Sequence, residues 1–184
     1  MIQRLDSIKL KIDESEDKLL HIACKKCGRN LKYFKILKKS LDARDKNNIY
    51  WVYSIAFSDA EEEENLPPLE KLANPPKVAV IGAGPAGLFC ALRLIEHGIS
   101  PVIIERGERV EDRRQTTQSF FENRTLNVNS NVQFGEGGAG AFSDGKLNTQ
   151  THDGLNKEVL KFFHKFGAPE EVLYLNKPHV GSDN

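Results

Sequence analysis

One stretch of the chain constrains its fold more than any other, because an apolar run, a glycine-rich turn and a helical pattern follow one another directly. Val78-Ala79-Val80-Ile81 has the unbroken apolar character of a buried parallel strand. Gly82-Ala83-Gly84-Pro85-Ala86-Gly87 then opens a segment with apolar residues at helical spacing, namely Leu88, Ala91, Leu92 and Ile95. Gly98 ends that segment, and a second apolar run, Val102-Ile103-Ile104, leads to Glu105. This order predicts a βαβ unit with parallel strands.

The glycines of this turn have the spacing that a dinucleotide site needs. Gly82 allows a tight turn off the strand, and Gly84 lets the backbone approach a pyrophosphate closely. The phosphates would then lie at a helix N-terminus, where unpaired N–H groups and the macrodipole favour negative charge. Pro85 suits the first helical position, and the small Gly87 allows the helix to pack closely on the strand. The turn therefore predicts a dinucleotide-binding loop.

The acidic residue about twenty positions after the turn narrows the ligand. Glu105 ends the second apolar run, where its carboxylate would accept hydrogen bonds from the adenosine ribose hydroxyls. The same charge would repel a 2′-phosphate. The unit thus favours FAD or NAD over NADP, and it does not distinguish FAD from NAD.

A second glycine-rich segment runs from Asn131 to Leu147. Glycines at this density predict a loop that approaches another group closely or adopts positive φ angles. Phe134, Phe142 and Leu147 interrupt it as candidate anchors, whereas a flexible linker is mostly glycine and serine. A flavin ring and its pyrophosphate would account for such a loop.

Several stretches resemble one family. They are Glu105-Arg106-Gly107, the segment from Asn131 to Leu147, Gly167-Ala168-Pro169, residues 177–183, and Lys38-Lys39-Ser40-Leu41-Asp42-Ala43-Arg44. In these the chain is similar to the uncharacterised FAD-dependent dehydrogenases of bacteria and plastids, often described as NAD(FAD)-utilising dehydrogenases. The resemblance implies a Rossmann-like oxidoreductase that binds FAD, with NAD(P)H as a candidate electron donor and an unknown substrate.

Site residues carry over from this resemblance by position. The FAD pyrophosphate would be bound by Gly82, Gly84, Pro85, Ala86 and Gly87. Glu105 would bind the ribose and Arg106 the adenine edge. The loop that approaches the flavin would include Gly137, Gly138, Ala139, Ser143, Gly145 and Lys146. No catalytic acid, base or nucleophile is assigned, because the chemistry would belong to the flavin.

The family members are several hundred residues long, so the resemblance implies that this chain is an N-terminal fragment. A fragment of such a domain would leave a sheet edge unpaired and a pocket wall missing. We therefore expect weak or absent FAD retention by the chain alone.

Charge divides the chain. Residues 1–58 carry 13 lysines and arginines against 7 acidic residues, whereas residues 59–75 carry 1 against 6 and contain paired prolines. We therefore expect an α/β protein with a small N-terminal α+β (β-α-β-β) domain over 1–58. An acidic, proline-containing linker over 59–75 and an incomplete Rossmann-like FAD-binding domain over 76–184 would follow it.

The N-terminal domain predicts strands at Ile8–Ile12, Tyr33–Leu41 and Ile49–Ser58. A helix through Cys27, capped by Asp13 with Glu16 and stopped by Gly28, would lie between the first two. An RNA-binding or interaction module is an alternative for 1–58, but its aromatic residues Trp51, Tyr53 and Phe57 are predicted to form the core face. Cys24 and Cys27 are interpreted as ordinary helix cysteines, and Cys90 as packing; no metal site is predicted.

Two more helices are expected later in the chain. The first is a polar stretch that ends near Phe121. Its residues Arg113 and Arg114 are expected to contact solvent. The second, from Asp153 to Phe166, would bury Leu155, Val159, Phe162 or Phe163, and Phe166.

The composition predicts a cytoplasmic protein. The chain has zero net charge, three cysteines, no signal-peptide pattern and no run of membrane-spanning length. Its partners would be a cofactor and an unknown substrate, with neither membrane nor nucleic acid expected. A NAD-binding enzyme without flavin stays an alternative, and a flavin-dependent tRNA-modifying or thiazole-forming enzyme is disfavoured by the segment from Asn131 to Leu147.

Overall fold

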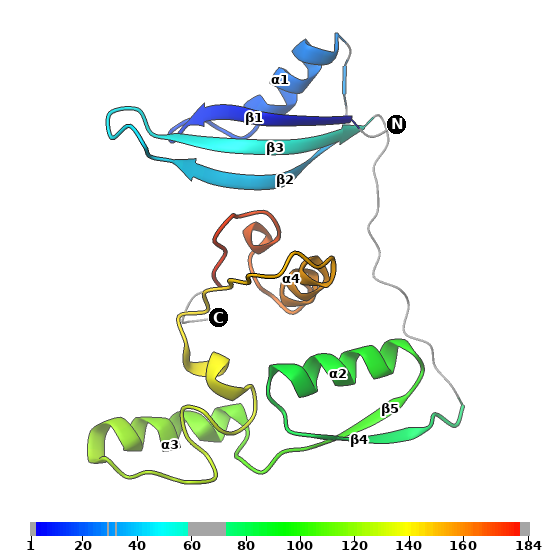
Figure 1. Cartoon of the computed structure of the whole chain (residues 1–184), viewed down its shortest axis with the longest axis vertical. Coiled ribbons are helices and arrows are strands. Elements are labelled where there is room, and N and C mark those ends of the chain that lie inside the picture. Colours follow the sequence, from blue (N-terminus) through cyan, green and yellow to red (C-terminus); the bar gives the residue numbers. More distant parts are fainter. Residues whose placement is uncertain (1–2, 29, 32, 59–72, 181–184) are drawn as a thin grey trace. The chain divides into compact units, whose positions relative to one another are not determined.

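The structure is a computed structural model that describes residues 3–28, 30–31, 33–58 and 73–180 (Figure 1). By their internal contacts these residues form two compact units. The first unit contains the described residues of 1–64 together with those of 146–184, and the second contains the described residues of 65–145. Most of the predicted acidic linker lies outside the described residues, and the domain boundaries drawn from composition stay a prediction.

A three-stranded antiparallel sheet with one helix opens the first unit. Its elements are β1 (Gln3–Lys11), α1 (Lys18–Cys27), β2 (Tyr33–Asp42) and β3 (Tyr50–Ser58), and the strand order is β1-β3-β2. The predicted β-α-β-β order is therefore confirmed. α1 covers one face of the sheet (Figure 1), and the core between them consists of Ile8, Leu10, Leu19, Ala23, Leu31, Tyr53, Ile55 and Phe57.

Three aromatic residues of β3, Trp51, Tyr53 and Phe57, lie on the face that forms this core. Tyr53 and Phe57 are 1% and 3% exposed, and Trp51 packs against the cluster. Their interpretation as core residues is confirmed. Sheet-surface recognition of RNA requires exposed aromatic rings, so these three side chains do not provide it.

The predicted start of α1 is wrong. Asp13 with Glu16 was expected to cap the helix, but α1 begins at Lys18, and its N-terminal flanking residue Asp17 makes no side-chain capping bond. Glu16 instead accepts hydrogen bonds from Lys39 at 2.6 Å and from the hydroxyl of Tyr53 at 3.0 Å. Both partners are remote in sequence, so the local capping pattern did not reveal them. Gly28 ends the helix at φ 68°, as predicted.

Residues 146–180 complete the described part of the first unit. They form α4 (Leu155–Lys165) and the short helix η2 (Glu170–Leu173). A backbone bridge joins this segment to β2, since Lys39 donates to the Tyr174 carbonyl at 2.8 Å and accepts from the Asn176 amide at 2.9 Å.

The predicted buried face of α4 is correct only at its centre. Phe162 is buried and Val159 is half-buried, but Leu155 and Phe166 are 52% and 71% exposed. Leu155 lies in the first turn and Phe166 lies just after the last helical residue. Helical spacing predicts which residues share a face of α4, but it does not show that only the middle of that face is covered by other residues.

The second unit contains the predicted βαβ unit. β4 (Lys77–Ile81) and β5 (Ser100–Ile104) pair in parallel, and α2 (Pro85–Glu96) connects them (Figure 1). α3 (Val110–Asn123) and the short helix η1 (Gly138–Phe142) follow. The mixed α/β fold class is confirmed. Cys90 is a correction, because its side chain on α2 is exposed rather than packed.

One face of the β4–β5 sheet is apolar and exposed. α2 packs on the other face, over the buried Val80. On the open face Ile81, Val102 and Ile104 are 78%, 49% and 52% exposed. Parallel strands in proteins are normally covered on both faces. The described part of the second unit thus leaves apolar strand surface uncovered, which destabilises the sheet that supports the glycine turn.

None of the helices among the described residues combines the length and the apolar character needed to cross a bilayer.

Candidate functional site

The turn between β4 and α2 has the backbone conformation that its glycines predict. Gly82 adopts φ +97°, a value that side chains disfavour, and its amide donates to the Ile104 carbonyl at 2.8 Å. A Cβ atom on Gly87 would lie 2.0 Å from the Gly82 carbonyl oxygen and 3.5 Å from a Val80 methyl. Only glycine allows this approach of α2 to the strand, so the predicted close packing of helix and strand is confirmed.

Gly84 shows a different kind of freedom. Its φ of −76° suits any residue, and a Cβ atom there would meet no heavy atom within 4 Å. Neither backbone strain nor packing inside the protein therefore requires a glycine at this position. Gly84 immediately precedes α2, where first-turn N–H groups lack helical partners, and its predicted approach to a pyrophosphate stays a prediction.

Glu105 reaches back from the end of β5 to the glycine turn. Its carboxylate accepts hydrogen bonds from the Ala83 amide at 2.6 Å and from the Gly107 amide at 2.8 Å. These two bonds, that of Ala83 first, lower the pKa of Glu105 below the usual glutamate value and keep it ionised. Because each carboxylate oxygen accepts more than one hydrogen bond, Glu105 retains capacity for ribose hydroxyls.

The second glycine segment meets the first within the same unit. The Gly137 amide donates to the Ala83 carbonyl at 2.8 Å. A Cβ on Gly138 would lie 3.1 Å from Pro85 Cδ and 3.6 Å from Gly84 Cα. The two segments are remote in sequence, yet both flank the N-terminus of α2. The fold thus brings the backbone of both glycine segments together at the N-terminus of α2.

The predicted character of the second segment is confirmed in its backbone. Gly135, Gly137, Gly138 and Gly145 all adopt positive φ angles. The segment is a loop apart from η1. One predicted anchor is wrong, because Phe134 is 49% exposed and its ring lies 5.8 Å from the Arg106 guanidinium.

Three other predicted site residues, Arg106, Ala139 and Ser143, are exposed. The Ser143 hydroxyl accepts from the Gly145 amide at 3.1 Å and donates to the Gly140 carbonyl at 3.0 Å. These bonds stabilise the end of the loop, and the predicted ligand contacts of these residues stay predictions.

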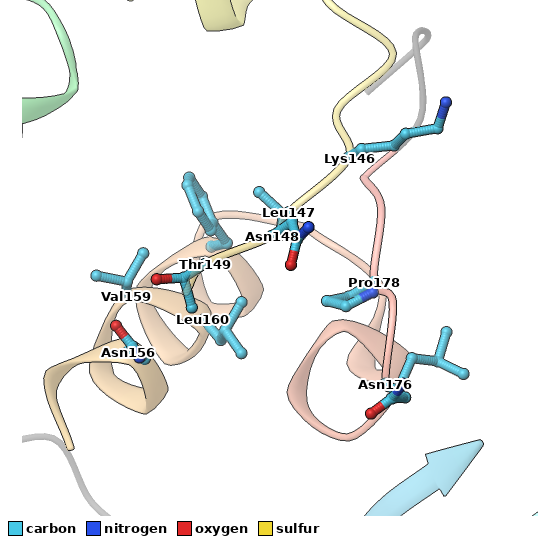
Figure 2. A pocket seen from close by; sticks show the side chains of 11 residues that line it. Lys146, Leu147, Asn148, Thr149, Asn156, Val159, Leu160, Asn176 and Pro178 are labelled. Atoms are coloured by element: carbon cyan, nitrogen blue, oxygen red, sulfur yellow. The ribbon is translucent and has the colours of Figure 1, made fainter. Parts of the chain in front are cut away.

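Lys146 belongs to the first unit, whereas the other predicted site residues belong to the second. It forms a backbone bridge with His179 at the edge of a cavity of about 390 Å³. Apolar side chains and amides line this cavity, among them Leu160, Phe163, Asn148 and Asn176. Figure 2 shows the Lys146 side chain extending away from the other lining residues.

Arg113 is a site residue that the sequence analysis missed. It was expected to meet solvent, but it is 0% exposed and its guanidinium binds backbone carbonyls of residues 131–138. Its neighbour Arg114 is exposed, as expected. The helix that carries both has almost no apolar stripe, and its sequence gave no sign of which arginine is buried. The one hint in the sequence is the glycine-rich segment from Asn131 to Leu147, because the carbonyls of such a loop need hydrogen-bond donors from elsewhere in the chain.

Comparison with known proteins agrees with this geometry. Residues 76–133 match a family model described as an FAD binding domain, and residues 1–58 match one described as a domain of unknown function (DUF8436). The chain is 39% identical over 206 aligned residues to a protein of Clostridium beijerinckii (strain ATCC 51743 / NCIMB 8052) described as an uncharacterized protein. That alignment covers the whole of this chain and 38% of the relative.

The FAD binding domain match begins just before β4 and includes the glycine turn, α2, β5 and Glu105. It supports FAD binding by this part of the chain and a Rossmann-like fold. The chain spans little more than a third of the length of its relative.

Proposed function

We propose that this chain belongs to a cytoplasmic FAD-dependent oxidoreductase of the dehydrogenase type. The observation that carries the proposal is the meeting of two glycine segments at the N-terminus of α2, beside an ionised Glu105. The FAD binding domain match over the same residues supports it. FAD, when bound, would supply the ring that accepts a hydride or an electron pair.

The residues of this chain would bind and orient the cofactor. First-turn N–H groups of Ala86 and Gly87 would donate to the diphosphate, and Gly84 would leave room for it. Glu105 would accept from the ribose hydroxyls while holding the Ala83 amide. Gly137 and Gly138 would form the opposite side of the site. We further propose that the loop up to Gly145 approaches the flavin and that Arg106 contacts the adenine edge.

We expect weak retention of FAD by this chain alone. The uncovered residues Ile81, Val102 and Ile104 support this expectation, because the sheet that holds the site lacks one covering layer among the described residues. The chain should therefore be colourless as purified and should bind added FAD in a titration. The relative from Clostridium beijerinckii, which is longer, should carry the visible flavin bands.

The decisive experiment replaces Gly84, a glycine that neither backbone strain nor packing within the protein requires. Gly84→Val should leave the fold intact, because nothing lies within 4 Å of its Cβ position, and should weaken FAD binding at least about tenfold. Gly154→Val is the matched control, since Gly154 also precedes a helix, has a φ of −60° and has open space around its Cβ position. FAD binding is measured by quenching of flavin fluorescence.

Two outcomes contradict the proposal. Unchanged FAD affinity of the Gly84→Val protein would place the diphosphate elsewhere. Binding of NAD with no uptake of FAD in the same titration would favour the alternative of a NAD-binding enzyme without flavin, which the turn and Glu105 suit equally well.

A further inference from the structure

Arg113 is a charged side chain in an unusual environment. It is 0% exposed, although its neighbours Asp112 and Arg114 on α3 are exposed. A buried guanidinium is costly unless hydrogen bonds satisfy its donors. Its position therefore implies a specific set of partners.

The partners are main-chain carbonyls of one short segment. The Nε atom donates to the Asn131 carbonyl at 3.1 Å. Nη2 donates to the carbonyls of Asn131 at 2.8 Å, Val132 at 3.2 Å and Gly138 at 3.0 Å, and Nη1 donates to that of Glu136. One planar fork thus binds carbonyls at both ends of residues 131–138. Few other side chains present so many donors in a fixed geometry.

Carboxylates nearby balance the charge without being hydrogen-bond partners of the guanidinium. Burial lowers the pKa of Arg113, while the charges of Glu105, Glu108 and Glu136 raise it. Each of these carboxylates is hydrogen-bonded elsewhere, for example Glu108 to the Thr116 hydroxyl at 2.6 Å and Glu136 to the Val110 amide at 2.8 Å. The hydrogen bonds of the guanidinium therefore go to the backbone carbonyls of the loop.

Glycines make room for this arrangement. A Cβ on Gly135 would lie 2.3 Å from Arg113 Cδ, and one on Gly107 would lie 2.4 Å from Gly135 Cα. Gly135 also adopts φ +117°. The Phe142 ring lies 4.8 Å from the guanidinium carbon and completes its surroundings. Side chains at positions 135 and 107 would therefore clash with Arg113 or with the loop above it, and glycine at both positions leaves space for the buried arginine.

The loop that Arg113 holds is the one that contacts the turn before α2. Arg113 binds the Gly138 carbonyl, a Cβ on Gly138 would lie 3.1 Å from Pro85 Cδ, and the adjacent Gly137 amide binds the Ala83 carbonyl. We propose that Arg113 is a positioning residue for the dinucleotide site, which fixes the loop of residues 131–142 beside the N-terminus of α2 without touching the ligand. This inference rests on the function proposed above.

The test compares Arg113→Gln and Arg113→Lys with the control Arg114→Gln, all in the full chain. Hydrogen exchange in peptides covering residues 131–142 is measured without ligand, and FAD affinity is measured by fluorescence. We expect Arg113→Gln to accelerate loop exchange and weaken FAD binding, each by about tenfold or more, because buried carbonyls lose their donors. Arg114→Gln should change neither.

The lysine variant separates charge from geometry. Its ammonium restores the charge but not the planar fork, so we expect little recovery of loop protection. Full recovery by lysine would overturn the assignment of the fork as the organising group. Exchange of α2 peptides, which lie in the same unit as Arg113, reports whether each variant is folded.

A second variant keeps the inference testable if the glutamine protein unfolds. Arg113→Ala leaves a cavity that ethylguanidinium can enter, and its addition should restore loop protection. No recovery with a folded protein would contradict the inference, and so would a mobile loop with unchanged FAD affinity. Failure of the wild-type chain to bind FAD would instead refute the proposed function, while the exchange results would still show whether Arg113 organises the loop.

Discussion

Replacing Gly87 by alanine tests the central packing contact of the βαβ unit. The new Cβ would lie 2.0 Å from the Gly82 carbonyl oxygen, so α2 and the turn must separate by about 1.5 Å to reach ordinary contact. Alanine favours a helix interior over glycine by about 1 kcal/mol. Overpacking costs about 1–3 kcal/mol of stability. We expect the upper value, about 3 kcal/mol, because the clashing atom is a backbone oxygen that cannot rotate away as a side chain can. The net loss is about 2 kcal/mol.

The assay must report on the second unit. Trp51 is the sole tryptophan and lies in the first unit, so its fluorescence serves as an internal control and should be unchanged. Hydrogen exchange of the α2 amides should accelerate roughly 30-fold, the equivalent of about 2 kcal/mol. Gly154→Ala, where the new Cβ meets open space, should cost less than about 1 kcal/mol. Wild-type exchange of α2 in the Gly87→Ala protein would refute the reasoning.

Three further predictions concern ionisable and reactive groups. Because the pKa of Glu105 is lowered, its hydrogen bonds stabilise the fold above the usual glutamate pKa of 4.5, and this stabilisation is lost as the pH falls below that value. Hydrogen exchange of the loop peptides at graded pH would detect the loss, and exchange protection that does not change with pH would contradict the prediction. Burial raises the pKa of Tyr174 to about 12, so its tyrosinate absorbance should appear only above the range of an ordinary tyrosine, and stability should fall as the pH rises from 10 toward 12; a Tyr174→Phe protein with the same titration curve would contradict this. The exposed Cys90 should react with a thiol reagent faster than the two half-buried cysteines of α1, and a Cys90→Ser protein that retains the fast phase would show otherwise.

The local patterns of the sequence were sufficient to predict the elements of the βαβ unit. Apolar runs, helical spacing and the glycine turn predicted β4, α2 and β5 because each signal arises from neighbours along the chain. Gly82 and Gly87 were predicted with their roles, since a positive φ and a close helix contact are both requirements that only glycine meets.

Contacts between remote residues decided the rest. Glu16 binds Lys39 and Tyr53, which are remote in sequence, and no capping pattern reveals such partners. The exposure of Phe166 depends on where the packing surface of α4 ends.

The clearest case is the pair of adjacent arginines on α3. In sequence Arg113 and Arg114 are chemically identical, and by itself the chain determined only that two cations follow one another on a polar helix. The tertiary structure decided that one of them is buried against the carbonyls of residues 131–138, while the other is exposed. The physical reason is that burial of a charge depends on donors and acceptors brought together by folding, and these are not encoded in any local pattern.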